Sequence, residues 1–140
     1  MHATPRTDEV KLRVGKSATL QEAIRIRKES IGSSGEHARI YPMKAWEEIE
    51  KKLAKLSSHN RAKQKFLARA NYYGQAVEVD GQGRILIPPV LRESAEMKGE
   101  VDVQGQLTYL EVWNHARFLE QLNRNPITAE DEKALDELGI

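Results

Sequence analysis

Cysteine is absent from the 140-residue chain, as are the features that mark secretion or membrane insertion. Without cysteine, neither a disulfide framework nor a thiolate metal site is possible, which fits a reducing compartment. No apolar run approaches the roughly 20 residues needed to span a bilayer. Residues 2–9 are polar and lack the apolar core of a signal peptide. We therefore expect a protein that stays in the cytosol.

Motifs for catalysis are missing as well. The segment Gly81-Gln82-Gly83 lacks the third glycine of a dinucleotide-binding fingerprint, and it opens a strand where that fingerprint would open a helix. There is no G-x-x-x-x-G-K-[ST] phosphate-binding loop. The histidines show no metal-binding spacing, and we expect them at the surface or in caps; they are His2, His37, His59 and His115. The sequence predicts no catalytic residue, no metal, no cofactor and no small-molecule substrate.

Positive and negative charges nearly cancel, giving a formal net charge of +1, but they are unevenly distributed along the chain. Residues 1–28 carry a net +4, residues 61–92 again carry +4, and residues 111–140 carry −4. Two basic segments and an acidic end suggest one positive face and a repelling or regulatory tail. Scatter of these charges over a solvated surface is the simpler alternative.

The most informative stretch of the chain is residues 77–93, which read V-E-V-D-G-Q-G-R-I-L-I-P-P-V-L-R-E. Two valines alternate with acidic residues, as in a strand with one buried face. Gly81 and Gly83 can take the positive φ angles that a tight turn needs. A β-branched return strand begins at Arg84, and a proline pair then ends it and suits the first turn of a helix. We predict a rigid hairpin with Arg84 just after its turn.

This hairpin sequence resembles the signature of the MraZ family, within the wider SpoVT-AbrB class of DNA-binding folds. The similarity runs from about Ala38 to Leu122 and includes A-R-I-Y-P-M-K-A-W-E-E-I-E, N-R-A-K-Q-K-F-L, N-Y-Y-G-Q and Y-L-E-V-W-N. The resemblance implies two β units per chain and assembly into rings. It also implies binding to short direct repeats upstream of a cell-division and cell-wall operon, whose transcription the protein would regulate.

A degenerate first copy of the hairpin is expected near the N-terminus. An ungapped shift of 71 residues places Glu9 on Asp80 and Arg13 on Arg84. The copy is damaged, because Leu12 stands where Gly83 stands, and without glycine a turn of the same shape would be strained. A chance match is the alternative interpretation.

The first unit is also expected to be shortened. We predict a short helix from Leu20 to Glu29 and a strand from His37 to Tyr41. The second unit should have a further strand at Glu100–Gln104, and nothing comparable fits between Ile31 and Gly35.

The predicted fold is α+β, mainly β with helices: a double-split or swapped-hairpin AbrB-like β-barrel, built from two β units joined by a helical hairpin. An N-terminal unit would cover residues 1–46, the helical hairpin 42–73, a C-terminal unit 75–122 and an acidic tail 123–140. Caps are predicted from short polar residues: Asn60 for the second helix of the hairpin, Asn114 for a core helix containing Phe118 and Leu122, and Thr128 with Asp131 as a capping box for an acidic helix.

DNA binding has a physical basis in this hairpin. A two-stranded ribbon fits the major groove, and arginine can bind guanine O6 and N7 in a bidentate manner. Arg84 would be presented in this way, while Asp80 would hold its guanidinium or fix the turn. Basic residues on the neighbouring helix would contact phosphates. The alternative is that Arg84 only pairs with Asp80 and stabilises a surface hairpin. The Asp-x-x-x-Arg motif of the resembled family matches Asp80 and Arg84.

Our hypothesis is an oligomeric, DNA-binding transcriptional regulator of the cytoplasm and nucleoid, with double-stranded DNA and further copies of itself as partners. The candidate DNA-binding residues are Arg84, Asp80, Gln82, Arg13, Lys11 and Lys16, and the turn-forming residues are Gly81 and Gly83. The alternatives are an AbrB-like antitoxin or interaction protein whose acidic tail binds a protein partner, and a degenerate relative that keeps the assembly without DNA binding.

Overall fold

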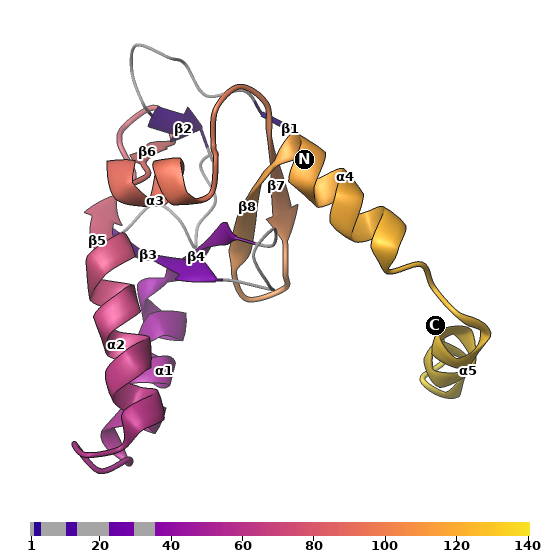
Figure 1. Cartoon of the computed structure of the whole chain (residues 1–140), viewed down its shortest axis with the longest axis horizontal. Coiled ribbons are helices and arrows are strands. Elements are labelled where there is room, and N and C mark those ends of the chain that lie inside the picture. Colours follow the sequence, from indigo (N-terminus) through magenta and orange to yellow (C-terminus); the bar gives the residue numbers. More distant parts are fainter. Residues whose placement is uncertain (1, 4–10, 14–22, 30–35) are drawn as a thin grey trace.

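The computed structural model describes residues 2–3, 11–13, 23–29 and 36–140. Eight strands and five helices lie within these ranges (Figure 1). In chain order they are β1 (His2–Ala3), β2 (Lys11–Arg13), β3 (Ala23–Glu29), β4 (His37–Pro42), α1 (Met43–Ala54), α2 (Arg61–Tyr73), β5 (Gln75–Glu78), β6 (Arg84–Leu86), α3 (Pro89–Ser94), β7 (Val101–Gly105), β8 (Leu110–Asn114), α4 (His115–Arg124) and α5 (Ala129–Glu137). None of these helices combines the length and the apolarity that crossing a bilayer requires.

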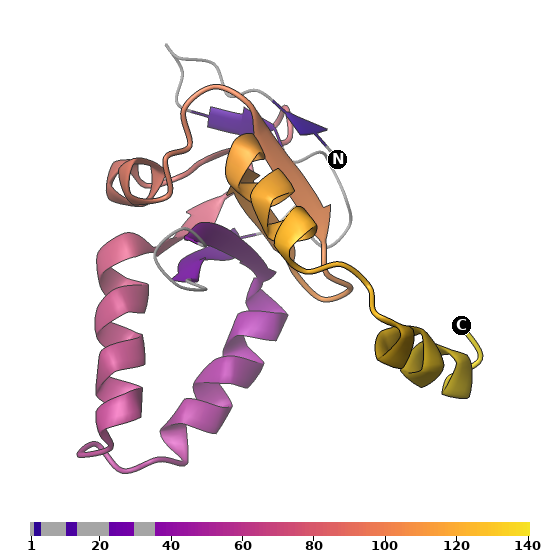
Figure 2. The ribbon, with the colours of Figure 1, turned by 45° about the vertical axis from the view of Figure 1, so that its right-hand side comes forward.

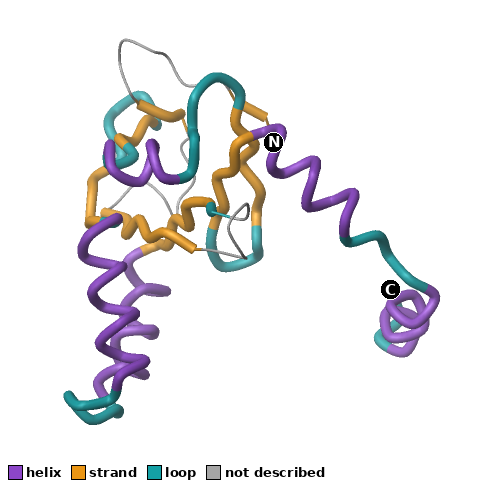
Figure 3. Tube along the Cα trace, viewed as in Figure 1, coloured by secondary structure: helices purple, strands orange, loops and turns teal. Residues whose placement is uncertain are grey.

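The described strands form a six-stranded sheet in the order β1-β7-β8-β4-β3-β5 and a separate two-stranded ribbon, β2-β6. Every neighbouring pair in both is antiparallel. Helices and strands are both prominent (Figure 3), so the predicted α+β class is confirmed. The described sheet is open, with β1 and β5 at its two edges, and does not close into the expected barrel.

Strand pairing ties the two halves of the chain together. The strand β1 pairs with β7, β5 with β3, β4 with β8 and β2 with β6, so each of these ladders joins a strand before α1 to one after α2. The sheet order has an approximate twofold symmetry. The strands β1, β7 and β8 in one half correspond to β5, β3 and β4 in the other half. Arg13 and Arg84, which the 71-residue shift equates, are direct partners in the β2-β6 ladder. The approximate axis therefore passes through this pair.

The strand β3 lies where the sequence predicted a helix, and that prediction was wrong. Ile24 and Ile26 are fully buried in the core, and the intervening Arg25 and Arg27 are only half-buried on the other face. This is the period-2 alternation of a strand with two different faces. The pairing of β3 with β4 matches that of β7 with β8. The strand that seemed to be missing from the first unit is therefore present.

The expected hairpin also needs correction, because β5 and β6 do not pair with each other. Their turn is closed by the Asp80 N–H donating to the Arg84 carbonyl (2.9 Å) and by the Gly83 N–H donating to the Asp80 carbonyl (3.0 Å). Beyond these bonds the two strands diverge, β5 toward β3 and β6 toward β2. A period-2 pattern identifies a strand, but it does not say which strand is its partner.

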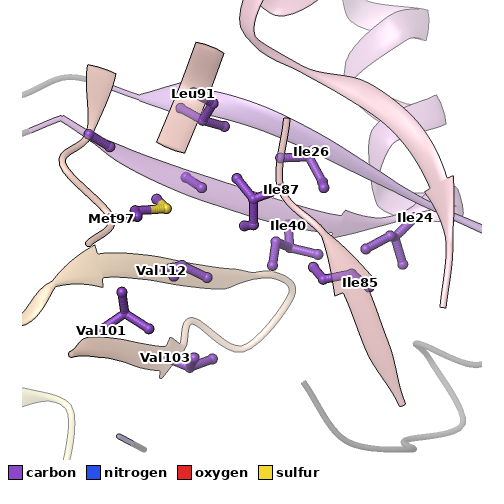
Figure 4. Packing of buried hydrophobic residues seen from close by; sticks show 12 residues of the cluster. Ile24, Ile26, Ile40, Ile85, Ile87, Leu91, Met97, Val101, Val103 and Val112 are labelled. Carbon is purple, nitrogen blue, oxygen red and sulfur yellow. The ribbon is translucent and has the colours of Figure 1, made fainter. Parts of the chain in front are cut away.

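The hydrophobic core lies on one face of the sheet, under β6 and α3 (Figure 4). Ile85, Ile87 and Leu91, which follow the Asp80 turn, are at most 2% exposed and pack on the inward residues of the sheet. Those inward residues come from both halves of the chain; they are Ile24, Ile26, Ala38, Ile40, Val101, Val103 and Val112. The turn is therefore anchored directly to the core.

The opposite face of the sheet carries the predicted helical hairpin, α1 and α2 (Figures 1 and 2). Tyr41, Trp46 and Ala70 are buried at its base. The Arg25 guanidinium donates to the Ala70 carbonyl (2.6 Å) and lies 5.0 Å from the centroid of the Trp46 ring, so it joins the sheet to both helices. The predicted Asn60 cap is confirmed, since its side chain accepts from the Lys63 N–H (2.9 Å).

The C-terminal helices extend beyond the sheet (Figure 1). Asn114 caps α4 as predicted, accepting from the Arg117 N–H (3.0 Å), but no residue of α4 is buried, and Leu122 is 54% exposed. The description of α4 as a core helix was therefore wrong. The acidic helix α5 is present, and its capping box between Thr128 and Asp131 is formed in both directions.

Candidate nucleic-acid interface

The turn between β5 and β6 is organised around one carboxylate. Asp80 Oδ1 accepts hydrogen bonds from the backbone N–H groups of Gln82 and Arg84, both at 2.9 Å. Its other oxygen, Oδ2, accepts from the Arg84 Nε at 3.0 Å. The same side chain thus fixes the turn and orients the arginine. Both side chains are about a quarter exposed, so the pair lies at the surface with limited room to move.

These donors lower the pKa of Asp80 to about 2, from an ordinary 3.8. The hydrogen bond from the Arg84 backbone N–H is the largest cause, and partial desolvation opposes it. The Gln82 N–H and the Arg84 guanidinium add to the lowering. The carboxylate is therefore ionised throughout the physiological range and holds the turn as an anion.

Lowering the pH should loosen this turn. Because the pKa of Asp80 is lower in the folded than in the unfolded chain, its contribution to stability is complete above about pH 4 and is lost as the pH falls toward about 2. We expect Asp80→Asn to remove that part of the pH dependence, since an amide keeps the oxygen acceptor but does not titrate. Urea unfolding of both proteins between pH 2 and 6 measures it; parallel pH profiles would contradict the assignment.

Only one of the two predicted turn glycines is required by the backbone. Gly83 is buried and has a φ of 75°, a conformation that residues with a Cβ adopt at a cost. Gly81 is exposed, is not among the described residues with positive φ, and a Cβ there would meet no atom within 4 Å. The prediction that both glycines supply positive φ was therefore right for Gly83 and wrong for Gly81.

The first copy of the motif lies beside the second, because β2 pairs with β6. The backbone of Arg13 lies opposite Arg84, and that of Lys11 lies opposite Leu86. Lys16 and Glu9 fall outside the described residues. Arg13 and Arg84 were predicted as separate candidates, and their pairing in the ladder was not predicted. The 71-residue shift was the available signal, because residues equated by a twofold repeat can meet at its axis.

The basic side of α2 does not lie beside this turn. Arg61, Lys65 and Arg69 are exposed, whereas Lys63 is half-buried and donates from Nζ to the Leu56 carbonyl (3.1 Å). Figures 1 and 2 both show the α1-α2 hairpin on the far side of the sheet from the β2-β6 ribbon. The helix next to the turn is α3, and the Nε of its Arg92 donates to the Ile87 carbonyl (3.1 Å). Phosphate contacts beside Arg84 would thus not come from α2.

A buried polar network that the sequence did not predict joins β4 to β8. Glu111 accepts from the Arg39 Nε (3.1 Å) and the Trp113 Nε1 (3.2 Å), and the His37 Nε2 lies 3.1 Å from it. His37 is fully buried and stacks on Trp113 with ring centroids 4.0 Å apart, so its expected place at the surface was wrong. Burial alone would raise the pKa of Glu111, but these donors outweigh it and lower that pKa. Across the described residues, no cluster of three His, Cys, Asp or Glu side chains suits a metal ion.

Comparison with known proteins gives these features a family. The model of a family described as "MraZ protein, putative antitoxin-like" matches residues 74–138, from the end of α2 through α5. A protein of Acidobacterium capsulatum named "Transcriptional regulator MraZ" is 55% identical over 106 residues, which are 76% of this chain and 73% of the relative. The chain belongs to the MraZ family.

Two further MraZ relatives span a range of similarity. A protein of Koribacter versatilis with the same name is 55% identical over 107 residues, covering 76% of this chain and 73% of its own length. Another, from Shewanella sp. (strain MR-7), is 36% identical over 94 residues, which are 67% of this chain and 62% of that relative. These MraZ relatives are named as transcriptional regulators, a non-enzymatic role, in agreement with the lack of catalytic motifs in this sequence.

Proposed function

We propose that this MraZ-family protein is a DNA-binding transcriptional regulator that contacts the duplex with the β2-β6 ribbon and the Asp80 turn. The observation that carries the proposal is the geometry of Asp80, which holds Arg84 at a fixed place at the end of the ribbon. An arginine held in this way has lost much of its conformational entropy before it binds, so less is lost on contact with a base. The names of the relatives support a role in transcription.

Arg84 is the residue we assign to base recognition. Guanidinium groups bind guanine O6 and N7 in a bidentate manner, and this is the commonest specific contact in the major groove. Asp80 is a positioning residue, because it acts through Arg84 and through the turn. Gln82 is exposed at the tip of the turn, and its amide suits adenine N6 and N7. Gly83 supplies the backbone conformation, and Gly81 leaves the tip unobstructed.

The first unit contributes a second set of contacts in this proposal. Arg13 lies opposite Arg84 in the ladder and would contact the same stretch of duplex. Lys11, in β2, and Lys16, three residues after β2 in the sequence, would bind phosphates. Each phosphate contact releases counterions, so affinity should fall steeply as the salt concentration rises. The slope of log K against log salt concentration should be about −0.9 for each contact.

Assembly completes the proposed function. Rings of this chain would present several ribbons to short direct repeats upstream of a cell-division and cell-wall operon, within the cytoplasm and at the nucleoid. Repetition raises avidity without new contacts, because later binding events become intramolecular. In this scheme residues 1–46 and 75–122 are two β units, 42–73 links them and 123–140 is an acidic tail.

A second candidate, an antitoxin-like protein that binds a protein partner, is favoured by the exposed acidic helix α5. A toxin-like neighbouring gene would support it.

Fluorescence anisotropy tests the regulator directly. The wild-type protein should prefer a duplex from the region upstream of its own gene over a scrambled duplex. Arg84→Ala should lose about 1–3 kcal/mol of that preference, because one bidentate base contact is worth that much. Arg124→Ala removes an arginine from α4, away from the ribbon, and should keep the preference at each salt concentration.

The same titrations separate the alternatives. If Arg84→Ala and wild type discriminate equally, Arg84 does not read bases. If wild type binds both duplexes equally or neither of them, the regulator proposal fails and the partner-binding candidate takes its place.

A further inference from the structure

The sheet face that α1 and α2 cover carries an excess of positive charge (Figure 2). Arg25 and Arg27 of β3 lie on this face, and Arg39 of β4 is directly opposite Arg27 in the ladder. Glu29 forms ion pairs with both Arg27 and Arg39. Glu111 forms a further ion pair with Arg39 (3.1 Å), whereas Arg25 has none in the described part of the chain. Three guanidinium groups therefore share two carboxylates.

Arg25 is a half-buried cation whose contacts are all with neutral groups. Its guanidinium donates to the Ala70 carbonyl (2.6 Å) and the Asn71 Oδ1 (3.5 Å), and it lies 5.0 Å from the centroid of the Trp46 ring. Burial lowers its pKa, and the charge of the exposed Glu50 opposes that effect. Arginine nevertheless stays protonated in proteins. Because a desolvated cation without a counter-charge is costly, an anion beside Arg25 would stabilise the fold.

Two buried N–H groups on the same face lack an acceptor. The Nε atoms of Arg25 and Arg27 are both buried, and neither has a hydrogen-bond partner among the described residues. The other nitrogens of Arg27 donate to the Lys28 carbonyl and to Glu29, and its guanidinium lies 4.8 Å from the centroid of the Phe66 ring. Buried donors in proteins nearly always have a partner. These two N–H groups therefore point to an acceptor from outside the chain.

We propose that a small monovalent anion of the chloride class binds between Arg25 and Arg27, beneath the helical hairpin. Alternate residues of a strand are about 6.6 Å apart, and a hydrogen bond joins atoms about 3 Å apart, so one ion can accept from both Nε–H groups. A single negative charge also balances the one guanidinium in excess. Because the Nε atoms are buried, a phosphate that belongs to a nucleic acid cannot reach them. The ion joins β3 to α1 and α2, and this role is separate from the DNA contact proposed for the ribbon.

Chloride should stabilise the protein by mass action. A ligand that binds only the folded chain lowers the unfolding equilibrium constant in proportion to its concentration, once that concentration exceeds Kd. Urea unfolding without DNA measures the effect while chloride rises from about 1 to 300 mM and replaces gluconate, a bulkier anion, at constant ionic strength, so that screening does not change. We expect the unfolding constant of the wild type to fall toward tenfold for each tenfold rise in chloride above Kd.

Lysine substitutions make the test specific to this site. Arg25→Lys and Arg27→Lys each keep the positive charge but lose the Nε–H donor, so the unfolding constant of both should stay nearly unchanged as chloride rises. The matched control is Arg117→Lys on α4. Arg117 is also half-buried with an unpartnered guanidinium nitrogen, but its charge is paired with Glu96 (3.2 Å). This variant should keep the chloride dependence of the wild type.

Bromide locates the ion in the wild-type protein, so the test holds even where a lysine variant fails to fold. Bromide has the charge of chloride and nearly its size, and it scatters X-rays anomalously. Crystals grown in bromide should show an anomalous peak within hydrogen-bonding reach of the Nε atoms of Arg25 and Arg27.

Three results would overturn the proposal: no bromide peak at this place, a wild-type stability that responds to chloride no more than to gluconate, or an equal chloride response in the wild type and both lysine variants. None of these measurements contains DNA, so their failure leaves the regulator proposal standing. Loss of duplex preference in Arg84→Ala, in turn, should leave the chloride dependence unchanged.

Discussion

Gly74→Ala is expected to destabilise the protein by about 3 kcal/mol, the upper end of the usual cost of overpacking. Gly74 is buried where α2 ends and β5 begins. A Cβ added there would overlap the backbone carbonyl oxygen of Ile26 and would lie 2.9 Å from that of Ala70. Neither oxygen can rotate away as a side chain would, since one belongs to β3, which is paired on both sides, and the other to α2. The strand and the helix would have to separate.

Chemical denaturation followed by circular dichroism measures this effect, and the chain offers a matched control. Gly81→Ala adds the same methyl group to an exposed turn where no atom lies within 4 Å. It should change the free energy of unfolding by less than about 0.5 kcal/mol. Equal stability of the two variants would show that α2 and β3 are not packed as closely as the structure has them.

Glu111→Ala is expected to cost about 3 kcal/mol or more, in the range found when one partner of a buried ion pair is removed. The side chain of Glu111 is 11% exposed and accepts from Arg39 and Trp113, with His37 also in contact. Removing the carboxylate takes one acceptor from each of these groups in a largely buried site. The loss should appear as a lower urea midpoint with an unchanged slope.

Two further variants make this second prediction specific. Glu111→Gln keeps the size and an oxygen acceptor, so it should lose less stability than Glu111→Ala. Glu47→Ala removes an exposed carboxylate from α1 and should change stability by less than about 0.5 kcal/mol. If Glu111→Ala matched Glu47→Ala, the network between β4 and β8 would contribute nothing to the fold.

The parts of the fold that local chemistry decides were predictable. Asn60, Asn114 and Thr128 each accept from a backbone N–H three residues later, so a short polar residue before a helical pattern was enough to place them. The hydrogen bonds that Asp80 accepts from the Gln82 N–H and the Arg84 guanidinium are likewise local. The sequence predicted that Asp80 fixes the turn or holds the guanidinium, and in the structure it does both.

The parts that depend on distant partners were not predictable in the same way. Leu20 and Ile24 are four residues apart, as on one side of a helix, whereas Ile24 and Ile26 are two apart, as on one face of a strand. The pairing of β3 with β4 and β5 decides between the two patterns. The partners of β5 and β6 lie more than 45 residues away, so no local pattern could show that the hairpin opens. His37 meets Glu111 across 74 residues for the same reason.

The axis through Arg13 and Arg84 also bears on the kind of DNA site that suits this protein. Two identical units related by a true axis would present the same side chains in both directions, and they would match an inverted repeat. Here both units belong to one chain and have diverged, with Leu12 standing where Gly83 stands and Glu9 where Asp80 stands. Such a ribbon has a distinguishable front and back. Under the proposed function it would recognise a directional sequence, and several copies would bind repeats of that sequence placed head to tail along the duplex.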